Sequence, residues 1–177
     1  MAWSIRLKNY YYAFALTDFF VFLSCAETEY LMKVLTLIKI TLGVSIGLML
    51  LALTQEAYCT AEGCMHSMMA FIFGIFGMFI GGNETLTWFA NPLLILAWLL
   101  IKYRKTSFLL SLLSTLIAVS FLMFDEVVVT EAGHSSMTTR YALGYWLWVG
   151  SHAVMVLGNV LIMINGHYYL KTETKND

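Results

Sequence analysis

The chain has 177 residues, of which 60% are hydrophobic and only 12% are charged. A soluble domain carries about 25% charged residues, so a chain this poor in charge cannot cover a water-facing surface and is expected to contact lipid. The formal net charge of -1, without a basic block, excludes an electrostatic basis for nucleic-acid binding. We therefore expect an all-α, polytopic membrane protein.

Residues 1–31 are expected to form an amphipathic segment that lies at the membrane surface. The apolar run within them, residues 10–26, is about 17 residues long, short of the about 20 that a crossing needs, and Asp18 interrupts it. A second interpretation starts translation at Met32, because the sequence from there has the pattern of a signal sequence or signal anchor. Residues 32–177 are predicted to form a single transmembrane helical domain.

Three stretches are apolar and long enough for crossings, namely residues 34–54, 107–124 and 141–164. As helices they would be about 31, 27 and 36 Å long, against a hydrocarbon core of about 30 Å. Small residues recur at four-residue spacing in the first two stretches, at Gly43, Gly47, Ser107, Ser111 and Thr115. Such spacing favours close helix packing, within the chain or between copies of it.

Residues 66–105 contain an interrupted hydrophobic segment. The first piece, residues 68–81, would be only about 21 Å long as a helix. A polar break follows, and Asn91-Pro92 then resembles a helix start, with Asn91 as the N-cap. Alternatively, residues 85–101 form one crossing with an early kink at Pro92.

The distribution of Lys and Arg decides between topologies. If residues 66–105 cross once in total, Lys102, Arg104 and Lys105 lie on the cytoplasmic side with both termini, in agreement with the positive-inside rule. We therefore predict about four transmembrane helices plus a short re-entrant or interrupted helical segment, with five crossings as the alternative. The loops at 55–65 and 125–140 would then lie outside, the second with a short extended stretch at 127–130.

Two groups of polar residues are candidate ligand-binding sites. Asn83, Glu84, Trp88 and Asn91 surround the polar break, and a carboxylate at membrane depth suggests a function. The alternative places Glu84 in a solvated turn. His152 and Asn159 share one face of the last stretch, where a hydrogen bond between helices is favoured over a ligand site. No catalytic residue, metal site or cofactor is predicted.

Cys59 and Cys64 lie in the loop at 55–65. On the outer side of the membrane they would form a structural disulfide. The competing interpretation is a redox-active pair, although the spacing is not the CxxC of thiol oxidoreductases.

Trp88, Ala90, Asn91, Pro92 and Leu93 form a W-x-A-N-P-L stretch, and Gly144 to Trp148 read GYWLW. In these features the chain resembles small bacterial inner-membrane proteins that have no assigned activity. The resemblance implies a multi-pass protein of the bacterial inner membrane and no catalytic role for any residue.

The expected function is therefore non-enzymatic binding, in the membrane, of a protein partner or a small ligand. The alternatives are a membrane redox protein that uses Cys59 and Cys64, and a transporter or channel subunit with its site around Glu84. The expected partners are the lipid bilayer and either a second copy of the chain or another membrane protein, and nucleic acid is not among them.

Overall fold

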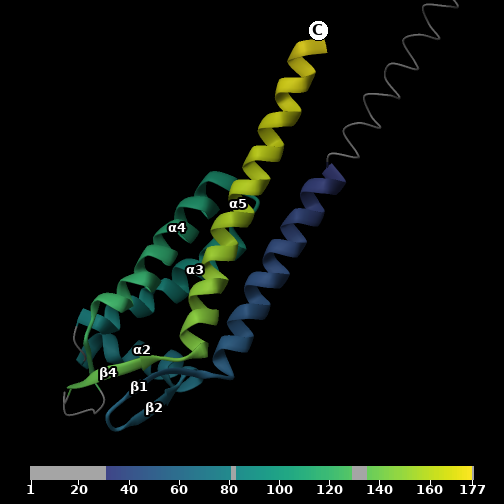
Figure 1. The fold of residues 1–177 in the computed structure, drawn as a ribbon. Helices are drawn as coiled ribbons and strands as arrows, with labels where there is room; N and C mark the ends of the chain where they lie inside the picture. Colours follow the sequence, from purple (N-terminus) through teal and green to yellow (C-terminus); the bar gives the residue numbers. More distant parts are fainter. Residues whose placement is uncertain (1–30, 81–82, 129–134, 177) are drawn as a thin grey trace, which may run out of the picture.

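The computed structural model describes residues 31–80, 83–128 and 135–176, so the predictions for residues 1–30 lie outside the described residues. Figure 1 shows long helices running side by side with a small sheet across one end of them. In chain order the elements are the helix Leu31–Leu53, β1 Glu56–Thr60, β2 Gly63–His66, α2 Ser67–Ile80, the 3-10 helix η1 Asn83–Phe89, α3 Ala90–Leu99, α4 Arg104–Ser120, the 3-10 helix η2 Phe121–Met123, β3 Glu126–Val128, β4 Ser135–Tyr141 and α5 Leu143–Asn176.

The sheet corrects the all-α prediction. The two stretches predicted as polar loops form antiparallel hairpins that join in the order β2-β1-β4-β3. Side chains alternate between more and less buried along β4, as expected where one face of a strand packs on the protein. The extended stretch expected at 127–130 corresponds in part to β3. Local hydrophobicity did not reveal the sheet, because its strands are short and polar.

The β1–β2 hairpin has a turn that requires glycine. Gly63 has φ of +146°, a conformation that residues with a Cβ rarely adopt. The Thr60 hydroxyl accepts a hydrogen bond from the Glu62 N–H and donates one to the Gly63 carbonyl. This turn sets Cys59 directly opposite Cys64.

Three helices in the described part of the chain are long and apolar enough to cross a membrane: Leu31–Leu53, Arg104–Met123 and Leu143–Asn165. The first helix runs antiparallel to α5, and α4 runs antiparallel to both α3 and α5. The Ser45 hydroxyl in the first helix donates to the carbonyl of Ser151 in α5. Two hydroxyls of α4 donate to α3, Ser107 to the Ala97 carbonyl and Ser114 to the Ala90 carbonyl. The serine seam predicted for α4 therefore lies within the chain.

In the second part of the interrupted segment, η1 is followed directly by α3, and α4 packs along both. At about 2.0 Å per residue for η1 and 1.5 Å for α3, the two have a summed length of about 29 Å, close to one crossing. Asn91 is not an N-cap, which corrects that prediction: α3 begins at Ala90 after Phe89, and no side chain caps it. Pro92 lies in the first turn, where the missing N–H costs little.

The preceding helix α2 lies against η1 and the sheet (Figure 1). The Trp88 indole N–H donates to the Phe71 carbonyl. A Cβ on Gly74 would lie within 3.0 Å of the Trp88 ring, so the glycine permits this close contact. These contacts hold α2 at the sheet end of the bundle.

The glycine pair predicted for helix packing, Gly43 and Gly47, meets no other part of the described chain. A Cβ on either residue would have no described atom within 4 Å. Packing at this pair therefore stays a prediction for contacts between copies of the chain. The sheet end differs, because a Cβ on Gly144 would come within 3.0 Å of the Ser67 hydroxyl and the Glu56 carbonyl oxygen. Gly144 thus allows the first turn of α5 to dock against β1.

Candidate functional site

A buried polar seam runs through the helical bundle. Its members are at most 4% exposed and come from the first helix, α3, α4 and α5: Ser45, Asn91, Ser107, Ser111, Ser114, Ser151, His152 and Asn159. Between them lie apolar side chains, among which Leu94 and Met155 are fully buried. Polar groups buried in this way hold helices together where lipid offers them no hydrogen bonds.

Asn91 and His152, two of the predicted site residues, lie on either side of Trp148. The Trp148 indole N–H donates to the Asn91 side-chain oxygen at 2.8 Å. The His152 Nδ1 lies 2.7 Å from the Trp148 carbonyl oxygen, and the two rings meet edge to face. Because a carbonyl only accepts, Nδ1 carries the proton in this contact.

Asn159 lies in another part of the seam. Its side-chain NH₂ group donates to the hydroxyls of Ser107 and Ser111 at 3.0 and 3.3 Å. The Ser107 hydroxyl in turn donates to the Ala97 carbonyl, so one chain of hydrogen bonds joins α5, α4 and α3. Asn159 thus makes the interhelical hydrogen bonds that the sequence favoured.

The other predicted site residues lie nearer the sheet. Asn83 begins η1. Glu84 is partly buried and acts electrostatically on Tyr58 of β1, at the sheet end of the bundle. Trp88 is held by Phe71 of α2. The six predicted ligand-binding residues are therefore divided among the sheet end, the Trp148 contact and the Asn159 network.

An aromatic cluster joins the sheet to the bundle. Tyr58, Phe121, Tyr141 and Tyr145 pack with ring centroids 5.1 to 5.9 Å apart. Burial, and then the Glu84 charge, raise the pKa of Tyr58 above its usual value. Burial, and then the Asp125 charge, raise the pKa of Tyr141 in the same way. Both phenols therefore stay protonated at neutral pH.

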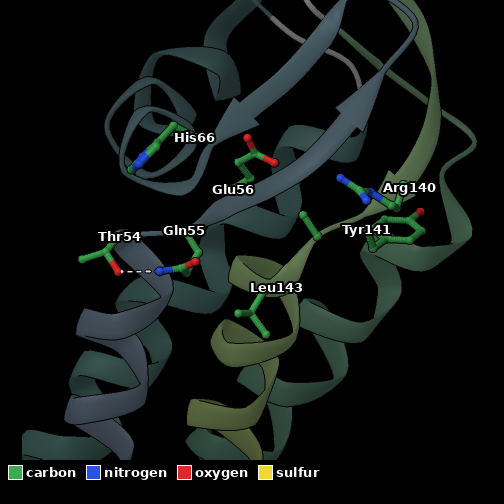
Figure 2. Close-up of a pocket in the computed structure, with 8 residues that line it drawn as sticks. Thr54, Gln55, Glu56, His66, Arg140, Tyr141 and Leu143 are labelled. Atoms are coloured by element: carbon green, nitrogen blue, oxygen red, sulfur yellow. Dashed lines mark hydrogen bonds between the residues drawn. The ribbon is translucent and has the colours of Figure 1, made fainter.

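A pocket of about 580 Å³ lies where two long helices meet the sheet. Figure 2 shows its lining side chains, which come from the end of the first helix, β1, β2, β4 and the start of α5. They are Thr54, Gln55, Glu56, His66, Arg140, Tyr141, Ala142 and Leu143. The pocket therefore combines groups of both charges with an apolar edge at Leu143.

Local structure fixes the polar groups of the pocket. Glu56 of β1 is paired with His66 of β2, so the two residues lie opposite each other in the hairpin. The Gln55 amide donates to the Thr54 hydroxyl, as the dashed line in Figure 2 shows. The His66 Nδ1 accepts from the Met68 N–H, which positions the imidazole at the start of α2.

Cys59 and Cys64 are joined by a bond of 2.00 Å across the hairpin. The Arg140 guanidinium donates from Nη2 to the Cys59 Sγ at 3.6 Å. A Glu56 carboxylate oxygen lies within 4.8 Å of both sulfur atoms, a group that resembles a metal site. In the bonded state the sulfurs are not thiolates, and thiolates are the form that binds metal, so this state does not offer a metal site.

Sequence reasoning missed the pairing of Glu56, His66 and Arg140. Thr138, Thr139 and Tyr141 were a signal for a strand, and Gly63 was a signal for a tight turn. Neither signal shows which strands pair, and that pairing sets Arg140 opposite Cys59.

No protein family model matches this chain, and neither a curated protein nor a solved structure is similar to it. Its function is therefore inferred from the chemistry of its own residues.

Proposed function

We propose that the chain is a small integral membrane protein that binds a zwitterionic ligand at the outer surface of a bacterial inner membrane. The pocket at the junction of sheet and helices carries this proposal. It presents cationic Arg140 and anionic Glu56 beside the apolar Leu143, at the level where two of the apolar helices end.

Membrane embedding is supported by the side chains around the bundle. Large apolar residues point away from the protein along all three long helices, for example Leu50, Leu109 and Leu161, which are 60%, 63% and 51% exposed. A monomer in water rarely exposes apolar patches of this extent, whereas lipid solvates them. Polar side chains inside the bundle and apolar side chains outside it are the reverse of the distribution in a soluble helical bundle.

The orientation is supported by charge. The end away from the sheet carries Lys102, which follows α3, and Arg104 and Lys105, which begin α4. The sheet end carries several carboxylates, among them Glu56, Glu62, Asp125 and Glu126, and Arg140 as a cation. Because cytoplasmic loops are enriched in Lys and Arg, the sheet belongs on the outer side.

Cysteine labelling of intact cells tests this orientation. In a chain with Cys25→Ser and Cys59→Ser, we expect a membrane-impermeant maleimide to label the exposed Cys64 without lysis. The matched variant has all three cysteines changed to serine and Lys105→Cys added, and we expect labelling only after lysis. The reverse pattern would contradict the orientation, and labelling of both in intact cells would contradict a chain that crosses the membrane between them.

The ligand class follows from the pocket's charges. Arg140 suits a phosphate or carboxylate, since guanidinium donates two parallel hydrogen bonds to such groups. The α5 N-terminus begins at Leu143, and helix N-termini favour negative charge. Glu56 would repel a pure anion but would pair with an ammonium group. We therefore expect a ligand with both charges, such as the phosphate and ammonium of a phosphatidylethanolamine headgroup.

Lipid retention is the test of the pocket. In native mass spectrometry of the detergent-purified chain, we expect phosphatidylethanolamine to be retained in preference to phosphatidylglycerol. Arg140→Gln and Glu56→Gln should each weaken retention about tenfold, the effect of losing one hydrogen bond to a charged group. Arg104→Gln, at the opposite end of the bundle, should retain the lipid.

Soluble phosphoethanolamine separates a headgroup site from a site that requires the lipid tails. Displacement by an excess of it would show that the charges alone are recognised. Equal retention of both lipids, together with an unchanged affinity in Glu56→Gln, would overturn the zwitterion proposal.

A further inference from the structure

The two sulfur atoms of the disulfide lie in different surroundings. Cys59, on the inner strand β1, is 6% exposed. Cys64 lies on β2, at the edge of the sheet, and is exposed to solvent. An attacking thiolate approaches in line with the S–S bond and needs access to one sulfur. Of the two cysteines, Cys64 is the accessible residue.

The buried sulfur is the one that contacts a cation. β1 and β4 pair with Cys59 opposite Arg140, so the sheet itself holds the guanidinium beside this sulfur. The Nη2–Sγ distance is 3.6 Å. A guanidinium in this position stabilises a thiolate, the species that leaves when a disulfide is attacked at the other sulfur.

We propose that Cys59–Cys64 is a thiol–disulfide exchange site, attacked at Cys64 by a protein dithiol on the same side of the membrane. The first thiolate of the partner forms a bond to the Cys64 Sγ. The Cys59–Cys64 bond breaks, and its electron pair stays on the Cys59 Sγ as a thiolate beside Arg140.

The partner's second thiolate completes the exchange. It attacks the partner sulfur of the mixed disulfide, and the Cys64 thiolate leaves. The partner dithiol is thereby oxidised to a disulfide by two electrons, and Cys59 and Cys64 are reduced to thiolates that take protons from water. A dithiol supplies both thiolates in one molecule, whereas a monothiol completes the exchange only when a second molecule attacks the mixed disulfide.

Other groups around the sulfurs modify this step. Burial of Cys59 disfavours its thiolate, so the contact with Arg140 is needed to offset the lost hydration. The Glu56 carboxylate, within 4.8 Å of both sulfurs, disfavours the same charge. We therefore expect opposite effects from the two charged residues beside the disulfide. Loss of Arg140 should slow the exchange, and loss of the Glu56 charge should accelerate it.

Reaction with glutathione tests the direction of attack. The full-length chain with Cys25→Ser is reacted in detergent with excess glutathione, quenched with acid and mapped by mass spectrometry. We expect the glutathione adduct on Cys64. An adduct on Cys59, or no adduct under conditions that reduce an exposed disulfide peptide, would overturn the proposal.

Rates in variants test the role of the charges. Arg140→Gln should slow the exchange about tenfold, Arg140→Lys should recover part of the rate, and Glu56→Gln should accelerate it. Arg104→Gln is the charge control and should leave the rate unchanged. Equal rates in all four variants would overturn the role of Arg140. If Arg140→Gln does not fold, the adduct position in the Cys25→Ser chain and the Glu56→Gln rate decide.

The exchange goes beyond ligand binding and does not depend on it. Glutathione reacts in detergent without added lipid, so loss of phosphatidylethanolamine retention leaves this test intact. Conversely, an unreactive disulfide leaves the lipid measurement unaffected.

Discussion

Gly158→Ala is expected to lower the free energy of unfolding by about 2 kcal/mol, within the range for overpacked interiors. A Cβ at this position would lie within 3.0 Å of the Thr41 side chain. Thr41 is 7% exposed and belongs to the first helix, so its branched side chain has little room to rotate away. The first helix and α5 would have to separate locally.

Chemical unfolding of the purified chain in mixed micelles measures this effect. Gly150→Ala is the matched control on the same helix, because its Cβ would meet only Leu48 Cδ1, at 3.8 Å. Alanine improves helix propensity by up to about 1 kcal/mol, so the control should be neutral or stabilising. Adding Thr41→Ala to Gly158→Ala should restore part of the loss, because the Thr41 Cβ that remains would still lie 2.8 Å from the new Cβ. Equal stability of the two alanine variants would contradict the close approach of these helices.

Leu94→Ala, as a separate variant, is expected to lower the free energy of unfolding by about 2 kcal/mol, because it leaves a cavity in the core. Leu94 is 0% exposed at the centre of the core that Ala97, Ile101 and Met155 complete. In a bilayer the transfer of leucine from lipid to protein contributes little, because both surroundings are apolar. The cost of the cavity remains, at about 24 cal/mol per Å³ of empty volume.

Leu109→Ala provides the matched control for the core substitution. Leu109 lies on α4 and is 63% exposed, so lipid or detergent fills the space that the shortened side chain leaves. We expect a change within about 0.5 kcal/mol, as for surface sites without special contacts. A cost equal to that of Leu94→Ala would show that a further protein surface covers Leu109.

Several features of the fold could be predicted from residues close together in the sequence. The three long apolar stretches form helices, and the interrupted segment contains two apolar helices, α2 and α3, although the predicted polar break at Asn83, Glu84 and Thr85 lies within η1. His152, Met155 and Asn159 lie on one buried face, as their helical spacing indicated. Each of these depends on local hydrophobicity and the 3.6-residue period, which a single segment carries.

Two predictions failed where long-range contacts compete with local signals. Asn91 has the sequence context of an N-cap, yet its side chain accepts the Trp148 indole N–H, a partner 57 residues away. The polar loops became strands because the two hairpins pair through β1 and β4. Neither hairpin alone has enough apolar surface to suggest a sheet.

The sequence by itself determined that the chain is mostly helical, poor in charge and asymmetric in the placement of its cations, because composition and period are local properties. The tertiary structure alone decided that Arg140 contacts Cys59 and that Glu56 and His66 share a pocket with it. These contacts join residues up to 84 positions apart, since Glu56 and Arg140 line the same pocket. Strand register creates them, and register depends on the packing of the whole sheet against the helices.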